Sequence, residues 1–130
     1  MVNLGSYLAV AGDVEGAVAA AREAIRLVRG NQAETYVAIA AQVLALCAAR
    51  VDPHRAARLL GYVDATDERR GAKHEPTEGI VREALVKRLE ERLEASILQA
   101  EIARGRELDP EAASELALAG AGFDHPNESA

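Results

Sequence analysis

A break at Gly12-Asp13 separates two stretches of helical hydrophobic spacing, and this feature constrains the fold of the chain most. Before the break, Leu4, Leu8 and Ala11 recur at i, i+4 and i+7, which places them on one face of a helix. Gly12 can take the positive φ that ends a helix, and Asp13 can cap the helix that follows. The sequence therefore predicts a helical hairpin, to which we expect the rest of the chain to add further helices.

The second helix of this hairpin is built from small apolar residues. Gly5 and Ala17 leave room for two helix backbones to approach closely, and Glu15 suits the positive end of the second helix dipole. The apolar side of this helix is formed by Val14, Ala17, Val18, Ala21, Ala24, Ile25 and Val28. The opposite side carries Arg22, Arg26 and Arg29.

The composition supports a helical fold throughout. Apolar residues make up 49% of the 130 residues, whereas aromatic residues make up 3%, so the core must be built from Ala, Leu, Val and Ile. No alternating strand pattern runs for more than a few residues, and strong helix formers are abundant. This length is enough for one domain with a core of its own.

Charge and cysteine usage exclude several classes of protein. The net charge of −6 argues against a nucleic-acid surface, which needs clustered Lys and Arg. No apolar run approaches the ~20 residues of a membrane span, and Met1 is not followed by the basic and apolar segments of a signal peptide. The single cysteine, Cys47, cannot form an internal disulfide, so we expect a cytoplasmic protein.

A second hairpin should follow the first. Its first helix is expected over about residues 31–51 and is apolar on most sides in its second half, which predicts neighbours on more than one face. Asp52 is a good N-cap and Pro53 a good first residue for the helix that follows. The two hairpins would thus cover about residues 2–30 and 31–67, the second as a degenerate copy of the first.

The last part of the chain adds two more helices. Residues 67–76 are polar and predict a surface loop. A long amphipathic helix is expected over about 77–105, in which the sequence permits a bend between Leu93 and Ser96. Asp109 and Pro110 start a short helix over about 110–119, and residues 120–130 are expected to form a flexible tail.

The first hairpin resembles a tetratricopeptide repeat (TPR). The matching residues are Asn3-Leu4-Gly5, Leu8, Gly12-Asp13, Ala17 and Ala24. Leu8 replaces the usual Tyr, and Ala21 replaces a larger apolar residue; a helical hairpin of no particular family is the alternative. The resemblance implies an all-α fold in which antiparallel hairpins stack as a short TPR-like right-handed solenoid. The C-terminal helices would close this solenoid, giving one domain over residues 1–119.

Two segments carry a more specific resemblance. Ala49–Glu68 contains DPHRAARLLG, and Ala84–Leu118 ends in RGRELDPEAASELAL. Both are similar to the C-terminal helical region of large bacterial ATPase-type transcriptional regulators of the LuxR and SARP types, although Leu93-Glu94 stands where such sequences often place a glycine. The resemblance implies a sensory or scaffolding arm, either as a fragment of a larger regulator or as a short stand-alone relative. Nucleotide and DNA binding would lie in other domains.

The sequence shows no pattern typical of a catalytic, cofactor or metal site. His54, His74 and His125 have no His, Cys or Asp partner at i+3 or i+4 that would complete a metal-binding face. Cys47 lies on an apolar helix face and is expected to be a small core residue rather than a nucleophile. We therefore do not expect an enzyme.

Two surfaces are candidates for binding a partner. The inner surface of a repeat array would be lined by small apolar residues, which either bind an apolar helix or peptide or are covered by the later helices. These residues are Ser6, Ala9, Val10, Ala41, Ala45, Ala48 and Ala49. The second candidate is the stripe of Arg22, Arg26 and Arg29, which would suit an anion or an acidic peptide. Its alternative is a solvated face paired with Glu15 and Glu23.

The sequence favours a non-catalytic protein-interaction or scaffolding module in bacterial signalling or transcriptional regulation, bound to a protein partner or to the rest of a larger regulator. The alternative is a small-ligand sensor with a pocket between the hairpins and the 77–105 helix. Because two hairpins are fewer than the three or so repeats usually needed, we also expect a homodimer formed through Leu4 and Leu8.

Overall fold

The chain folds into α-helices throughout its described part. The computed structural model describes residues 12–27, 33–71 and 76–119, and these contain no strand, which confirms the predicted all-α class. The helices are α2 (Val14–Leu27), α3 (Ala33–Ala48), α4 (Pro53–Arg70), α5 (Pro76–Arg92), α6 (Ala95–Gly105) and α7 (Pro110–Leu118).

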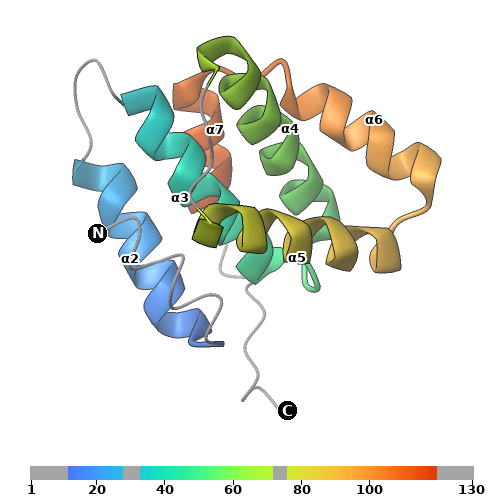
Figure 1. The fold of residues 1–130 in the computed structure, drawn as a ribbon, viewed down its shortest axis with the longest axis horizontal. Helices are drawn as coiled ribbons and strands as arrows, with labels where there is room; N and C mark the ends of the chain where they lie inside the picture. Colours follow the sequence, from blue (N-terminus) through green and yellow to red (C-terminus); the bar gives the residue numbers. More distant parts are fainter. Residues whose placement is uncertain (1–11, 28–32, 72–75, 120–130) are drawn as a thin grey trace.

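Four of the helices lie side by side, in the order α2, α3, α4 and α6, and two others cover this row (Figure 1). α5 crosses in front of the row and α7 lies behind it, and both contact α3 and α4. As a result α3 contacts α2, α4, α5 and α7, and it occupies the centre of the molecule. In an open solenoid each repeat would contact only its neighbours, whereas here α7 returns to pack on α3.

The central helix is buried on every side in its second half. All residues from Ala40 to Ala49 are buried, and Leu44 is among the largest fully buried side chains. A helix that is apolar all round needs neighbours all round, so its burial follows from its sequence. The prediction that this helix packs on more than one face is confirmed.

Aspartates start three of the helices. Asp13, Asp52 and Asp109 each accept a hydrogen bond from the backbone N–H three residues later, at 3.0, 3.2 and 2.7 Å. Such bonds satisfy N–H groups that have no partner within the helix. Gly12, which precedes the first of these caps, has a positive φ of 89°. The predicted starts of α2, α4 and α7 are therefore confirmed.

The fourth helix is longer than its sequence suggests. α4 continues through the charged residues after Asp67 and ends at Gly71, which has the left-handed φ of 61° and donates its N–H to the carbonyl of Asp67. The prediction of a loop from residue 67 was wrong because charged residues such as Arg69 are good helix formers. Gly71 was the stop signal.

The long helix expected over 77–105 is two helices. α5 ends at Arg92, and Glu94 adopts an extended conformation with φ −62° and ψ 149°, after which α6 sets off in a new direction. These are ordinary dihedrals for a non-glycine residue, so the turn needs no glycine. The apolar residues of this segment do not form one continuous buried face. Leu98 is buried, whereas Ile97 and Ile80 are exposed.

Candidate interaction surface on helix α6

Three of the predicted interaction residues are not at an open surface. Ala41, Ala45 and Ala48 are at most 1% exposed, because α5 and α7 cover α3. The expectation that these alanines line a binding surface is therefore corrected. Ser6, Val10, Leu4 and Leu8 lie outside the described residues, as do the first helix of the predicted hairpin and the tail over 120–130.

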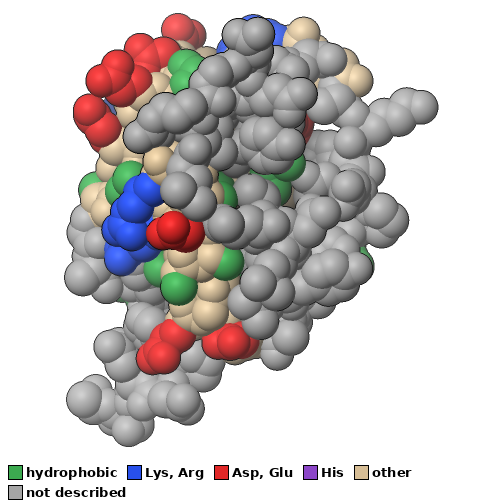
Figure 2. Space-filling view, turned by 90° about the vertical axis from the view of Figure 1, so that its left-hand side faces the viewer, with side chains coloured by type: hydrophobic (Ala, Val, Ile, Leu, Met, Phe, Trp, Pro, Cys, Tyr) green, Lys and Arg blue, Asp and Glu red, His purple; other side chains and the backbone are tan. Residues whose placement is uncertain are grey.

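The predicted arginine stripe is only partly described. Arg22 is half-buried, Arg26 is exposed, and Arg29 lies outside the described residues. Arg26 lies 4.0 Å from the carboxylate of Glu23, one turn earlier on the same helix. Figure 2 faces this side of the molecule and shows basic and acidic side chains interspersed. The described part of α2 therefore presents a mixed charged face.

Helices α4 and α6 cross at two glycines. A Cβ atom on Gly61 would overlap the carbonyl group of Ile102, and a Cβ on Gly105 would overlap the carbonyl group of Arg58. The two backbones thus touch directly at both positions. Only glycine allows this approach, so these residues fix the distance between the helices.

A buried carboxylate links the same two helices. Glu101 on α6 is 3% exposed, and its Oε1 accepts hydrogen bonds from Arg58 Nε and Arg104 Nη1, both at 3.1 Å. Its Oε2 lies 2.8 Å from Nδ1 of His54 in the first turn of α4. We call Glu101, His54, Arg58 and Arg104 the Glu101 cluster. The sequence analysis examined His54 only for partners at i+3 and i+4 and so missed this contact.

The cluster keeps Glu101 ionised. Burial raises the pKa of its carboxyl, but hydrogen bonds from Arg58 and His54 and the charges of Arg58 and Arg104 together hold the pKa below its usual value. Because an ionised carboxylate only accepts hydrogen bonds, Nδ1 of His54 carries the proton in their contact. The cluster is therefore one buried anion surrounded by two guanidinium groups and an imidazole.

Three other arginines tie the helices together. Arg82 on α5 makes two hydrogen bonds to Asp64 on α4, at 3.0 and 2.8 Å. Arg106 makes a similar pair to Glu68, at 2.9 and 2.8 Å, which holds the end of α6 to α4. Arg88 on α5 donates to the carbonyl of Leu46, in the last turn of α3, at 3.0 Å. These bonds fix α5 to α3 and α4, and they fix the end of α6 to α4.

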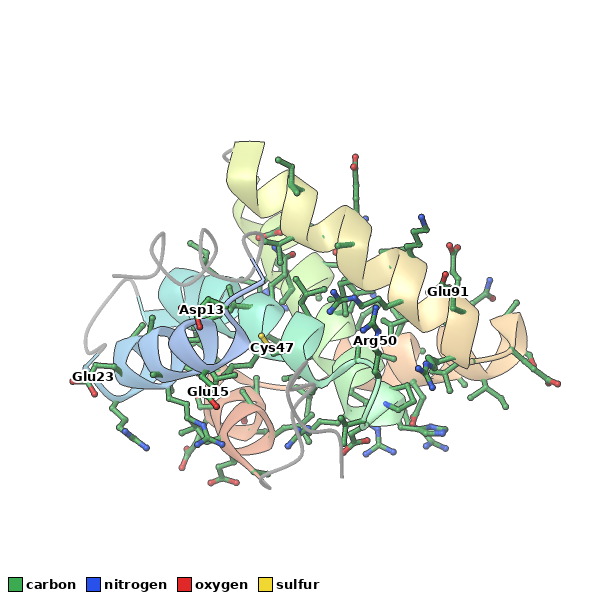
Figure 3. The ribbon with its side chains drawn as sticks, turned by 90° about the horizontal axis from the view of Figure 1, so that it is seen from below. Asp13, Glu15, Glu23, Cys47, Arg50 and Glu91 are labelled. Carbon is green, nitrogen blue, oxygen red and sulfur yellow. The ribbon has the colours of Figure 1, made fainter. Side chains whose placement is uncertain are left out.

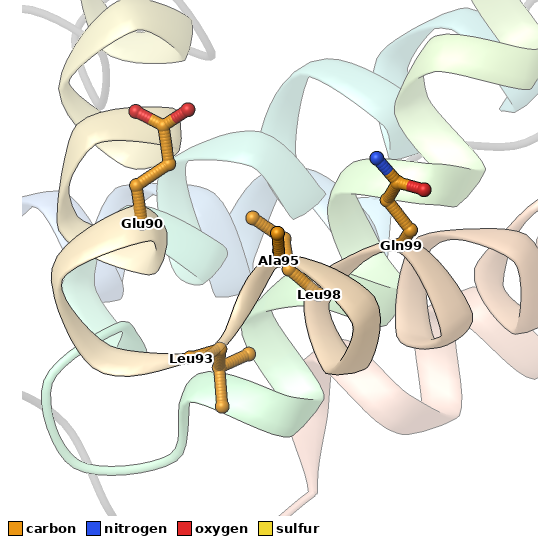
Figure 4. A pocket seen from close by; sticks show the side chains of 5 residues that line it. All are labelled: Glu90, Leu93, Ala95, Leu98 and Gln99. Carbon is orange, nitrogen blue, oxygen red and sulfur yellow. The ribbon is translucent and has the colours of Figure 1, made fainter.

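An open hollow lies at the corner where α5 turns into α6 (Figure 4). It is lined by the apolar side chains of Leu93, Ala95 and Leu98 and by the polar side chains of Glu90 and Gln99, with a volume of about 330 Å³. We call it the corner hollow. The sequence analysis placed a pocket between the hairpins and a continuous 77–105 helix, whereas the hollow is a product of the break in that helix.

The described residues were compared for groups of side chains that could hold a metal ion. Within residues 12–27, 33–71 and 76–119, no group of three or more His, Cys, Asp and Glu side chains could hold a metal ion. Cys47 is 2% exposed and lies on α3 in the interior (Figure 3). Glu23, by contrast, is exposed on the outer side of α2. His74 and His125 fall outside the described part.

Comparisons of the chain with family models, with curated proteins and with solved structures found no match. Among the helices that the structure describes, none combines the length and the apolar character needed to cross a membrane.

Proposed function

We propose that this chain is a non-catalytic protein-interaction module and that its partner binds at the corner hollow. The observation that carries this proposal is the hollow itself, because the apolar side chains of Leu93 and Leu98 and the polar side chains of Glu90 and Gln99 line it together. Interfaces between proteins commonly combine apolar and polar side chains in this way. An apolar side chain of a partner would fill the hollow as an anchor.

The surroundings of the hollow suit a docking surface. Among the described helices α6 packs mainly along α4, and Ser96, Gln99, Ala100 and Ala103 on its other side are exposed. The crossing glycines and the Glu101 cluster hold this helix in place before any partner arrives. A preorganised surface loses less conformational entropy on binding, which favours affinity.

The regulator resemblance suggests the biological setting. It covers α4 and the segment from α5 to α7, which includes the corner hollow and both crossing glycines. We infer that the chain serves as a TPR-like scaffolding arm of a cytoplasmic bacterial signalling or transcriptional regulator. Its partner would be another protein or another part of the same regulator, with no direct contact to nucleic acid or membrane.

A peptide-selection experiment tests the proposal. The immobilised chain is offered a display library of random peptides, and the selected peptides are then measured against two variants. Ala95→Trp fills the hollow from an exposed position, whereas Ala103→Trp adds the same side chain elsewhere on α6. We expect one enriched motif with an apolar anchor, whose binding is lost in Ala95→Trp and kept in Ala103→Trp. No enriched motif, or equal binding by both variants, would contradict the proposal.

A small-ligand sensor is the second candidate, because the volume of about 330 Å³ lies near the lower end of the ~300–1,000 Å³ of ligand pockets. A metabolite library screened by thermal unfolding separates the two candidates, since a ligand bound only to the folded state raises Tm. A rise in Tm that disappears in Ala95→Trp would favour the sensor.

Self-association through the first helix is a separate proposal. Light scattering on a size-exclusion column would compare the wild type with Leu4→Glu and Leu8→Glu. We expect a wild-type dimer that becomes a folded monomer in both variants. A wild-type monomer at tens of micromolar would contradict the dimer.

A further inference from the structure

The Glu101 cluster carries more positive than negative charge at the surface. The side chains of Arg58, His54 and Arg104 are 40%, 55% and 68% exposed, whereas the side chain of Glu101 is 4% exposed. Two permanent cations and one imidazole thus face one carboxylate. This surplus is local, because the whole chain has a net charge of −6.

The cations also have hydrogen-bond donors to spare. A guanidinium group has five N–H donors, and Arg58 and Arg104 each donate one of them to Oε1 of Glu101. The imidazole of His54 uses Nδ1 for Oε2, which leaves its second nitrogen for another partner. Asp52, the acid nearest to His54 along the chain, already accepts the backbone N–H of Arg55 and lies 3.6 Å from the Arg55 side chain. Glu107, three residues after Arg104, is exposed.

The lowered pKa of Glu101 indicates a positive electrostatic potential at the cluster. Burial alone would raise the pKa of Glu101, yet the surrounding cations hold it below its usual value. A negative charge is therefore stabilised here even though it has been removed from water. A second anion at the exposed side of the same cations would be attracted by the charge that Glu101 leaves unbalanced.

The geometry is fixed before a ligand arrives. Direct backbone contact at Gly61 and Gly105 sets the spacing of α4 and α6, and Glu101 orients all three basic side chains. We propose that His54, Arg58 and Arg104 form a binding site for a phosphate group. Two guanidinium forks present paired N–H donors, which match the oxygens of a phosphate, and two cations against one carboxylate leave positive charge for an anion.

This site is independent of the proposed function. On α6, Gln99 of the corner hollow and Arg104 of the Glu101 cluster lie on different sides of the helix. Leu98 and Glu101 are both buried, and there the two sets of residues approach each other. Loss of phosphate binding would leave the peptide selection at the hollow unaffected, so the two proposals can fail separately.

Thermal unfolding with inorganic phosphate tests the site. Tm is measured at pH 7 in sodium phosphate and in sodium chloride of equal ionic strength, so that general screening cancels. We expect phosphate at ten times its dissociation constant to raise Tm by about 5 °C in the wild type. Arg104→Gln should abolish the rise, whereas Arg92→Gln, which removes an exposed arginine from α5, should keep it.

An NMR titration provides a readout that a purely structural role of the cluster would not change. The imidazole signals of the three histidines are followed during addition of phosphate, with His54→Gln used to assign the signal of His54. We expect a saturable shift of the His54 signal alone. No saturable shift, an equal rise of Tm in Arg104→Gln, or an equal response to acetate at the same ionic strength would each overturn the assignment.

Discussion

Two helix pairs in this molecule achieve close packing by different means. α2 and α3 contact each other, and both contribute small apolar side chains such as Ala17, Ala21 and Ala40 to the common buried core. Where α4 meets α6, the backbones touch at Gly61 and Gly105, and a charged cluster lies beside them.

The two helix pairs should differ in how well they tolerate an added side-chain atom. Alanine methyl groups keep a layer of side chains between two helices, and longer side chains of the same core, such as Val18 and Leu44, can shift to other rotamers. A contact between backbones has no such layer, so any added atom must move a whole helix. The α4–α6 pair should therefore be the more specific of the two and the less tolerant of substitution.

The largest effect is expected from Gly105→Ala. Its new methyl group would overlap the carbonyl of Arg58, so α6 must move away from α4, and we expect a loss of at least about 3 kcal/mol in the free energy of unfolding. Gly79→Ala on α5 is the matched control, because no atom lies near its added methyl group and the helix should gain about 0.5–1 kcal/mol. Urea unfolding of both variants measures the difference, and equal stabilities would refute direct backbone contact.

Glu101→Gln should cost about 2 kcal/mol at pH 7, because it removes the charge from three hydrogen bonds to basic groups. The pKa of Glu101 is lower in the folded chain than its usual value near 4.5. Its contribution to stability is therefore fully present above that value and is lost as the pH falls through the folded pKa. Urea unfolding from pH 7 to pH 3 should show wild type and variant converging in acid. A constant difference would contradict the assignment of charge.

Ala17→Leu tests the other helix pair. This variant adds three carbons at a fully buried position of α2, yet we expect a cost of only about 1–2 kcal/mol because neighbouring side chains can repack. Urea unfolding beside Gly105→Ala makes the comparison direct. If three carbons at residue 17 cost more than one carbon at residue 105, then backbone contact is not what makes the α4–α6 pair sensitive.

The smallest effect is expected from Arg106→Gln. Arg106 and Glu68 form a well-aligned pair, and the pKa of Glu68 is lowered by the hydrogen bond and the charge of Arg106, but both groups are exposed. Solvent and salt screen such pairs, so we expect thermal unfolding to change little and the change to vanish at high salt. If Arg106→Gln lowered the free energy of unfolding as much as Glu101→Gln, then burial would not be what makes the Glu101 contacts more stabilising than the exposed Arg106–Glu68 pair.

Local signals predicted the helices well. The aspartate caps and the burial of α3 follow from residues close together in the chain, such as Asp52 with Pro53, or from the apolar run around Leu44. Interactions within one turn do not depend on the rest of the fold, so periodicity and capping chemistry reveal them. Whether the small apolar face of α3 binds a partner or is covered by later helices was left open, because nothing local shows which helices will cover it.

The candidate sites depend on contacts between distant residues. Glu101 bonds to residues 43 and 47 positions away, and Gly61 meets Ile102 on another helix. The break at Leu93-Glu94 creates the corner hollow and lets α6 turn back onto α4. No glycine or proline stands at this break to announce it in the sequence. An Arg58-x-x-Gly61 pattern facing Glu101-x-x-x-Gly105 was the available signal, and it acquires meaning only once the two helices are known to cross.

The position of α3 at the centre has a consequence for biosynthesis. α7, which covers one side of α3, begins about 60 residues after α3 ends. At a synthesis rate of ~5–20 residues per second, the ribosome needs roughly 3–12 s to add that length. During this interval α3, the most apolar of the described helices, lacks part of its cover. The nascent chain would therefore depend on chaperones at this stage more than the finished protein does.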